Sequence, residues 1–384
     1  AALTSGPPLG ATAFELGSAS PSTAVALGGD GRDDISFLQQ PFLAPRADAA
    51  ASTDPSPEPF RIGLRRESVP VYRRGKIASY KTSYSGVVHV GSPPQEFRVV
   101  FDTGSGHLVL PAAECKSEAC LVEGRRKFDM SASATSVPIN TDGSTVPDGE
   151  ACDQVTIGFG TGEITGEFAR DRVCFGLASH EEHPPTEGAE IGEPHPEQPA
   201  AAGMRGAASV VAPRWAVAAG QNEDELCVEM SVVLAVEMSS QPFKTFQFDG
   251  ILGLGLGALA LNSNFSTFEM LLGRGLPAGH FGVFLTEGED GEESEIAVGG
   301  ADNRRMLEPL HWAPVMMPEH GHWQVQILSV RINGHELDVC RDGTCRGVVD
   351  TGTSHLGVPA PADQEVAELL TRDAGDLLDC RIAD

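Results

Sequence analysis

The stretch VVFDTGSGHLVLP at residues 99–111 returns as GVVDTGTSHLGVP at residues 347–359, with Asp102 aligned on Asp350. The two copies are identical at six of the ten positions from the Asp to the Pro. In each copy, residues typical of β-strands lead directly into Asp-Thr-Gly, which places the Asp where a buried strand meets a turn. A carboxylate is costly there unless it has partners or a chemical task. The repeat therefore predicts two related halves that each contribute one acidic group.

If a twofold axis relates the two halves, Asp102 faces Asp350. Two carboxylates held that close cannot both ionise, so they share one proton over a wide acidic range. One then acts as a general base toward a water molecule, while the other, protonated, polarises the carbonyl group under attack. The repeat thus predicts general acid and base chemistry at acidic pH.

The composition is ordinary for a globular protein, but strongly acidic. The 384 residues, 41% of them hydrophobic, are enough for two lobes with a core each. The 54 acidic residues outnumber the 27 Lys and Arg, so the formal net charge is −27 and most of the surface would repel nucleic acid or an anionic membrane. No apolar run reaches the length of a membrane-spanning helix. We therefore predict no nucleic-acid partner and no membrane span in this chain.

The pattern of the chain is all-β. From Tyr84 onward, short runs of β-branched and aromatic residues alternate with Gly and Pro, and helices are predicted only near 265–275 and 364–372. Residues 1–60 are rich in Ala, Ser, Pro and Gly and are predicted to be a disordered leader. The basic segment 61–83, which begins RIGLRRESVPVYRRGK, either pairs with carboxylates of the body or is a solvated arm.

One segment is too long for an ordinary connection. Residues 177–225 are poor in apolar residues and rich in Glu, Pro, Ala and Gly, which predicts an acidic surface loop inserted in a first lobe of residues 84–260. The second lobe is then residues 261–384. His180 and His183 of the insertion have the chemistry of metal ligands, but a polar tract without anchored partners favours a solvated loop. No metal site is predicted.

The cysteines suggest short loops. Cys115 and Cys120 in CKSEAC, and Cys340 and Cys345 in CRDGTC, are spaced for tight disulfide loops and not for the C-x-x-C pairs of metal sites. This spacing favours two disulfides and an oxidising compartment. The alternative is four reduced, buried thiols, because sequence alone does not show pairing.

From about Tyr84 to its end, apart from the insertion, the chain resembles the pepsin-like aspartic proteases, whose dyad is the standard example of the shared-proton chemistry above. YSGVVHVGSPPQEFRVVFDTGS resembles the first strands of the family, IGFGTGEITG its flap hairpin, FDGILGLG the segment that closes the first lobe, and WQVQILSVRING the strand pair before the second Asp. The two short cysteine loops fall where the family keeps disulfides. The resemblance implies an all-β, bilobal fold with a cleft between pseudo-twofold-related lobes, and a monomeric endopeptidase that cleaves peptide or protein substrates without a cofactor.

Carried over position by position, the resemblance makes Asp102 and Asp350 the catalytic pair. Each copy also supplies a Thr that locks the two loops together, a Gly beside the dyad, and a hydroxyl that bonds to the outer carboxylate oxygen. These supporting residues are Thr103, Gly104 and Ser105 in the first copy, and Thr351, Gly352 and Thr353 in the second.

The segment Phe159, Gly160, Thr161 and Gly162 matches the tip of the flap, a hairpin that closes over an extended peptide. Taken alone, FGTG is typical of any hairpin turn; the neighbouring motifs favour the flap. Phe159 stands where the family usually has a Tyr, and Val109 where it usually has a Trp that bonds to that Tyr. Because both the Tyr and the Trp are absent, the donor and the acceptor of that bond are lost together, and no buried polar group is left without a partner. We therefore expect a larger, more apolar first subsite. Gly106 replaces the usual second Ser, which is a mild change.

Three further expectations follow from the resemblance. Segment 61–83 resembles propeptides that cover the dyad at neutral pH, which implies a zymogen of the secretory or endomembrane system, vacuolar-lysosomal or extracellular. Cys174 and Cys227 flank the neck of the insertion and are candidates for a third disulfide, whereas Cys152 and Cys380 have no assigned partner. The chain ends too soon after Asp350 for the remaining strands of the family, so the second lobe is expected to be incomplete and the chain itself inefficient.

The alternative function is a catalytically silent relative that only binds peptides or proteins. The retained pair of Asp102 and Asp350, with its hydroxyl partners, favours the enzyme, because a binding protein has no need for a costly carboxylate pair.

Overall fold

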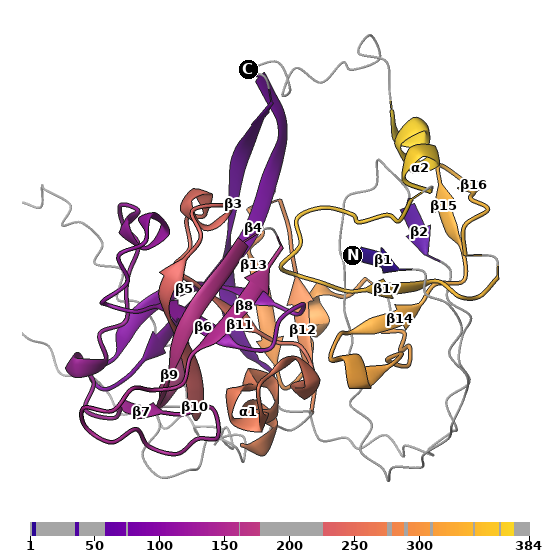
Figure 1. Cartoon of the computed structure of the whole chain (residues 1–384). Helices are drawn as coiled ribbons and strands as arrows, with labels where there is room; N and C mark the ends of the chain where they lie inside the picture. The colour runs from indigo at the N-terminus through magenta and orange to yellow at the C-terminus, as the bar shows by residue number, and fades with distance from the viewer. Residues whose placement is uncertain are drawn as a thin grey trace, which may run out of the picture.

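The computed structural model describes residues 2–4, 35–37, 58–73, 76–160, 162–176, 226–274, 279–287, 291–307, 310–340, 342–360 and 362–371. Strands dominate these ranges, and the α-helices among them are α1 (Thr267–Gly273) and α2 (Ala362–Leu370). Both helices overlap the predicted ranges, and the all-β class is confirmed (Figure 1). No helix in the described part of the chain is long and apolar enough to cross a membrane.

Most of the strands form one large sheet in the order β12-β13-β3-β4-β5-β11-β6-β10-β9-β7, with β8 paired to β9. Their bounds are β3 (Phe60–Arg73), β4 (Lys76–Val90), β5 (Gln95–Asp102), β6 (Leu108–Pro111), β7 (Val137–Ile139), β8 (Val155–Phe159), β9 (Gly162–Phe175), β10 (Leu226–Met238), β11 (Gly250–Gly253), β12 (Phe281–Phe284) and β13 (Ser294–Val298). Strand β5 runs parallel to β11, with Asp102 opposite Gly253. The first Asp of the repeat is therefore the last residue of a strand in the sheet interior, as the sequence predicts.

Two small sheets lie beside the large one, on the right of Figure 1. One has the order β1 (Ala2–Thr4), β17 (Arg346–Val348), β14 (Gln324–Gln326), and the other β16 (His335–Glu336), β15 (Val330–Ile332), β2 (Ile35–Phe37). Strand β17 ends just before Asp350 and so carries the second copy of the motif.

The predicted leader, residues 1–60, lies mostly outside the described residues. Two of its described stretches, β1 and β2, are strands and not coil: β1 pairs with β17, and β2 pairs with β15. The physical reason is that an open edge of a short sheet leaves N–H and C=O groups unpaired, and a short extended segment satisfies them. The structure therefore departs from a wholly disordered leader at these two places.

The start of the basic segment is joined to the body of the large sheet. Residues 60–64 of strand β3 pair with β13, whereas residues 65–73 pair with β4 in a two-stranded hairpin. Its Ile62 and Leu64 are buried in the main core. Its arginines reach carboxylates of the body, with Arg61 at 3.6 Å from Asp302 and Arg66 at 3.8 Å from Glu287. Of the two interpretations of this segment, pairing with the body is the one that the structure contains.

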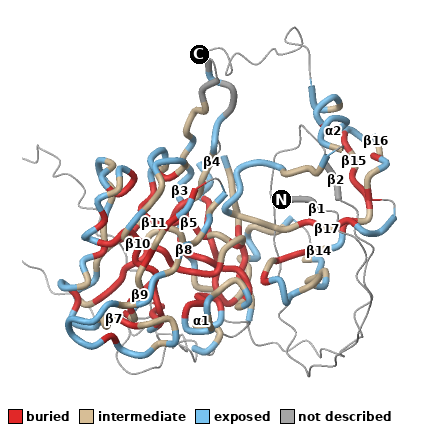
Figure 2. Tube along the Cα trace, in the orientation of Figure 1, coloured by how far each residue is buried: buried red, intermediate tan, exposed pale blue. Residues whose placement is uncertain are grey.

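The apolar core is unevenly divided, as Figure 2 shows. A main cluster and a second cluster around Val109, Phe168 and Phe265 fill the large sheet and its covering loops. Near β15, a separate cluster has seven buried members: Ile327, Val330, Ile332, Leu337, Cys340, Cys345 and Val366. The part of the chain that carries Asp350 therefore has the smaller core.

The structure joins Cys115 to Cys120, Cys340 to Cys345 and Cys174 to Cys227. The last pair lies on facing positions of β9 and β10, at the neck of the predicted insertion. Cys152 is half-buried and in no disulfide. The insertion itself and Cys380 lie outside the described residues.

Candidate active site

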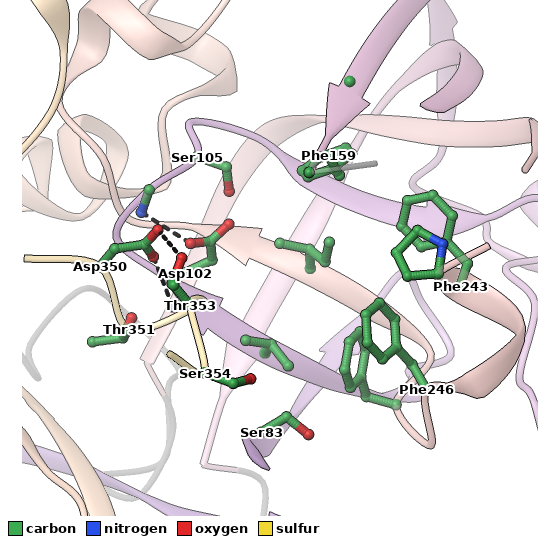
Figure 3. A pocket seen from close by; sticks show the side chains of 18 of the residues that line it. Ser83, Asp102, Ser105, Phe159, Phe243, Phe246, Asp350, Thr351, Thr353 and Ser354 are labelled. Carbon is green, nitrogen blue, oxygen red and sulfur yellow. Dashed lines mark hydrogen bonds between the residues drawn. The ribbon is translucent and has the colours of Figure 1, made fainter. Parts of the chain in front are cut away.

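The two aspartates sit on loops of the same construction. Asp102 ends β5, and the Gly104 N–H donates to its Oδ1 at 2.9 Å. Asp350 follows β17, and the Gly352 N–H donates to its Oδ1 at 2.8 Å. Figure 3 shows the two carboxylates facing each other at one end of a pocket. The structure thus brings together the two groups that the repeat singled out.

Two threonines cross-link these loops. The Thr103 N–H donates to Thr351 Oγ1 at 3.1 Å, and the Thr351 N–H donates to Thr103 Oγ1 at 3.0 Å. Each hydroxyl then donates onward to the opposite strand, from Thr103 to the Val349 carbonyl at 2.8 Å and from Thr351 to the Phe101 carbonyl at 2.5 Å. Because every bond has a counterpart in the other copy, the two loops are held in a reciprocal, twofold-like arrangement.

Glycine is required at the third position of each motif. A Cβ on Gly104 would lie 2.7 Å from Asp350 Oδ2, and a Cβ on Gly352 would collide with Asp102 Oδ1. Any side chain at either position would therefore push the opposite carboxylate away. The two glycines let the carboxylates approach each other.

The outer hydroxyls are not equivalent. Thr353 donates to Asp350 Oδ2 at 2.5 Å. The Ser105 hydroxyl is buried without a hydrogen bond of good geometry, although its closeness to Asp102 lowers the pKa of that carboxyl group. The twofold match between the copies therefore ends at this position.

The environment of Asp102 favours its protonated form. Burial is the largest influence, followed by the negative charge of Asp350; together they raise the pKa of Asp102 to about 6, against the opposing influence of the nearby Ser105 hydroxyl and of the Gly104 N–H. A hydrogen bond with Asp350 adds to the rise. A carboxyl group with this pKa keeps a proton in mildly acidic solution and can donate it to a substrate.

The dyad opens into a cavity of about 520 Å³. Hairpin β8–β9 forms one side of it, with Phe159 opposite Gly162 and Gly160 in the left-handed backbone region at φ 58°. Thr161, the remaining predicted flap residue, lies outside the described residues. An aromatic wall and a polar rim complete the lining: Phe243, Phe246 and Phe248 in the wall, and Lys81, Ser83, Ser354 and His355 on the rim. The cavity thus has the two carboxylates at one end and an apolar wall beside them.

Phe159 joins the flap to the aromatic wall. Its ring meets the Phe243 ring edge to face, with centroids 6.1 Å apart (Figure 3). Val109 is buried behind these rings in the same apolar cluster. The unusual pair Phe159 and Val109 is thus accommodated by apolar packing, and no polar group is stranded there. A wider first subsite stays a prediction. Gly106 packs so closely on the backbone of Leu259 that a Ser, as in the family, would not fit without movement.

Arg125, which the sequence analysis did not single out, is hydrogen-bonded to the backbone of the aromatic wall. The Arg125 guanidinium donates through Nη2 to the Phe243 carbonyl at 3.0 Å and to the Phe246 carbonyl at 2.7 Å. These two carbonyls bracket the short 3-10 helix η4 (Phe243–Thr245), whose flanking rings line the cavity. The aromatic spacing in QPFKTFQFDG was a signal for the wall, but nothing in the sequence linked Arg125 to it.

Comparison with known proteins agrees with this geometry. Residues 83–184 and 224–376 match the family described as eukaryotic aspartyl protease. The chain is 30% identical to chymosin from Callithrix jacchus over 277 residues, which are 72% of this chain and 55% of that protein. It is 30% identical to pepsin A-5 from Mus musculus over 294 residues (76% and 59%), and 29% identical to cathepsin E from Aquarana catesbeiana over 282 residues (72% and 54%). The chain thus spans little more than half the length of these relatives.

Proposed function

Since the chain belongs to the eukaryotic aspartyl protease family, we propose that it is an aspartic endopeptidase that hydrolyses peptide bonds at acidic pH through Asp102 and Asp350. The observation that carries this proposal is the reciprocal threonine lock, which holds two carboxylates face to face at the end of a cavity. A protein that merely binds peptides has no use for so costly an arrangement.

The proposed reaction uses one proton shared by the pair. Protonated Asp102 donates its proton to the oxygen of the scissile carbonyl, while the carboxylate of Asp350 takes a proton from the attacking water. The new C–O bond forms as the carbonyl π bond breaks, which gives a tetrahedral diol. Asp350 then passes its proton to the amide nitrogen while Asp102 takes a proton from a hydroxyl group of the diol; the C–N bond breaks, the products are a carboxylic acid and an amine, and the pair is back in its starting form.

The cavity sets how a substrate would lie. An extended peptide can add to the flap hairpin as a further strand, because hairpin edges offer backbone donors and acceptors. A side chain next to the scissile bond would then enter the space in front of Phe243 and Phe246. We therefore infer a preference for an aromatic or large aliphatic residue at that position.

The compartment and activation are also proposals. Three disulfides support the secretory or endomembrane system, where such bonds persist. Of the segment 61–83, Lys81 and Ser83 border the cavity, whereas β3 packs in the sheet. Coverage of the dyad by this segment at neutral pH stays a prediction.

The test is proteolysis of an unfolded protein and of quenched fluorogenic peptides by the 384-residue chain between pH 3 and 7, with and without a metal chelator. We expect cleavage in acid that resists the chelator and falls at least about a thousandfold in Asp102→Asn and in Asp350→Asn, since each removes one half of the acid-base pair. Cleavage that persists in Asp102→Asn, or that requires zinc, would refute the proposal. Tight peptide binding without cleavage would identify the silent binding protein instead. A second sample extended by the native sequence after Asp384 tests whether the full second lobe raises turnover.

A further inference from the structure

His107 lies at the end of the loop that carries Asp102 and is 8% exposed. Its Nε2 accepts a hydrogen bond from the Leu261 N–H at 3.0 Å. Its ring also meets the Phe265 ring edge-on, with centroids 5.9 Å apart. The imidazole therefore bridges the Asp102 loop and the segment 256–265, which covers it.

The rest of the loop is fixed by backbone bonds to the last residue of β11 and to the two residues after it. The Leu254 N–H donates to the Asp102 carbonyl at 2.8 Å, the Gly255 N–H to the Ser105 carbonyl at 2.8 Å, and the Gly253 N–H to the His107 carbonyl at 2.9 Å. These bonds do not change with pH in the range of interest, because no partner titrates. The side-chain bond of His107 is different, because its acceptor is a basic nitrogen.

Protonation of His107 would reverse its role in that bond. An imidazole nitrogen that accepts a hydrogen bond from a backbone N–H carries no hydrogen of its own. A proton on that nitrogen would make it a donor facing the Leu261 N–H, which is also a donor, and would place a positive charge in a buried site. Segment 256–265 and strand β6 contain no titratable residue. The charged or titratable groups nearby in the cavity are Asp102 and Asp350, with Lys81 and His355 on the rim, and on α1 the Glu269 carboxylate lies against Gly257. Burial lowers the pKa of His107 to about 4.

We propose that His107 is a positioning residue that holds the Asp102 loop against segment 256–265 only while its imidazole is neutral, and that it thereby sets the acid limit of the enzyme. The consequence for catalysis rests on the proposed function. The loss of the Leu261 hydrogen bond in acid does not depend on the proposed function, so this inference and the proposed function can be refuted separately.

The first experiment measures kcat/KM of the full chain from pH 3 to 7 with a quenched peptide, for wild type, His107→Asn and a control, His280→Asn. Asn keeps a side-chain acceptor but does not titrate. His280 is a second imidazole whose pKa is lowered by burial, and it packs on Trp312, away from the dyad. At pH 3, about one unit below the pKa of His107, we expect His107→Asn to retain about tenfold more of its maximal activity than wild type, with an unchanged neutral limb. An acid limb identical in all three proteins would overturn the proposal.

The second experiment needs no activity. In the Asp102→Asn chain, NMR follows protonation of the His107 imidazole and the hydrogen-exchange protection of the Leu261 amide. We expect protection of Leu261 to fall about tenfold per pH unit below the midpoint of His107 and to stay high in His107→Asn. Protection that does not change when His107 gains its proton would overturn the inference, even if the protein proves to be a protease. Should His107→Asn not fold, the coincidence of the two titrations in the Asp102→Asn chain decides the question.

Discussion

Asp102 is a residue whose proton binding links activity to stability. Its pKa is raised from 3.8 to about 6, chiefly by burial and by the charge of Asp350. The folded state therefore binds more protons than the unfolded state between these two values. The stabilising effect of this proton is complete below about pH 3.8 and is lost as the pH rises through about 6.

Replacing Asp102 by Asn is expected to stabilise the chain at neutral pH. Asn carries no charge, so the cost of a buried carboxylate beside Asp350 disappears, and the gain is on the order of 2 to 3 kcal/mol at pH 7. The gain should shrink toward zero near pH 3.5, where Asp102 is protonated in both states. Urea unfolding of both proteins at the two pH values measures this. A gain of the same size at both pH values would contradict the pKa assignment.

Thr103 is expected to be the most sensitive of the supporting residues. Thr103→Val keeps the volume but leaves the Thr351 N–H and the Val349 carbonyl without their bonds, so we expect a loss of about 2 to 3 kcal/mol in unfolding free energy. The matched control is Thr156→Val, since Thr156 bonds to Thr165 at 3.1 Å on an exposed surface. Urea unfolding should show a change within about 0.5 kcal/mol for the control. Equal losses would mean that the lock adds nothing beyond a surface bond.

These residues also show what a sequence reveals. Asp102 and Asp350 were predictable because the same phrase occurs twice, and in each copy residues typical of β-strands lead into Asp-Thr-Gly, which indicates a pair of carboxylates. The functions of His107 and Arg125 were not predictable, because their partners are backbone groups far along the chain, the Leu261 N–H for one and the Phe243 carbonyl for the other. Backbone partners leave no trace in residue identity.

Among the elements, the short helix η4 positions the aromatic wall of the cavity. It presents Phe243 to the flap, and its position depends on Arg125, whose charge is balanced by the buried Asp249. A small void of about 10 Å³ lies behind the wall, between Val109 and Phe248. This void holds no more than about one water molecule, so the wall is otherwise closely packed and its position depends on these hydrogen bonds.

Arg125→Met is expected to loosen substrate binding more than turnover. Without donors for the Phe243 and Phe246 carbonyls, η4 can move, and KM for peptides with an aromatic residue beside the scissile bond should rise about five- to tenfold, while kcat changes less than about twofold. The control is Lys244→Met on the same helix, because Lys244 bonds to Glu118 on an exposed surface. Steady-state kinetics on an aromatic and an alanine peptide separates the two variants. A fall in kcat alone would place Arg125 in another role.

Strand β3 shows the limit of local sequence patterns at this scale. The sequence marked it only as a basic segment, and its neighbour β13 is far away in the chain, with Leu64 opposite Ser294. Pairing over such a separation is set by the whole sheet, and no local signal names the partner. Hence the sequence left open whether this segment was attached or free.

For the molecule as a whole, the two carboxylates stand on supports of unequal strength. Asp102 belongs to the large sheet with its two apolar clusters, whereas β17, which leads to Asp350, belongs to a three-stranded sheet next to a cluster of seven buried residues. Less buried apolar surface means a lower free energy of local opening. The repeat predicted the symmetry of the two loops, but it carried no information about this difference in support.

Hydrogen exchange of the full chain is expected to reveal the difference. Amides of β15 and β17 should exchange roughly a hundredfold faster than those of β9 and β10, because they open with the smaller core. Mass spectrometry of peptic fragments, or NMR, measures both regions in one sample, and β10 serves as the internal reference. Equal protection in both regions would show that the two lobes open as one cooperative unit.

The disulfide between Cys174 and Cys227 has a consequence for how this protein can diversify. The two residues face each other in the ladder of β9 and β10, so the ends of the segment between them are fixed whatever its length. Because the entropy of closing a loop grows only with the logarithm of its length, added residues there cost little once the ends are fixed. Residues 177–225 therefore mark a position at which insertions can accumulate in evolution without disturbing the sheet that carries Asp102. For the same reason, a reporter domain can be inserted there.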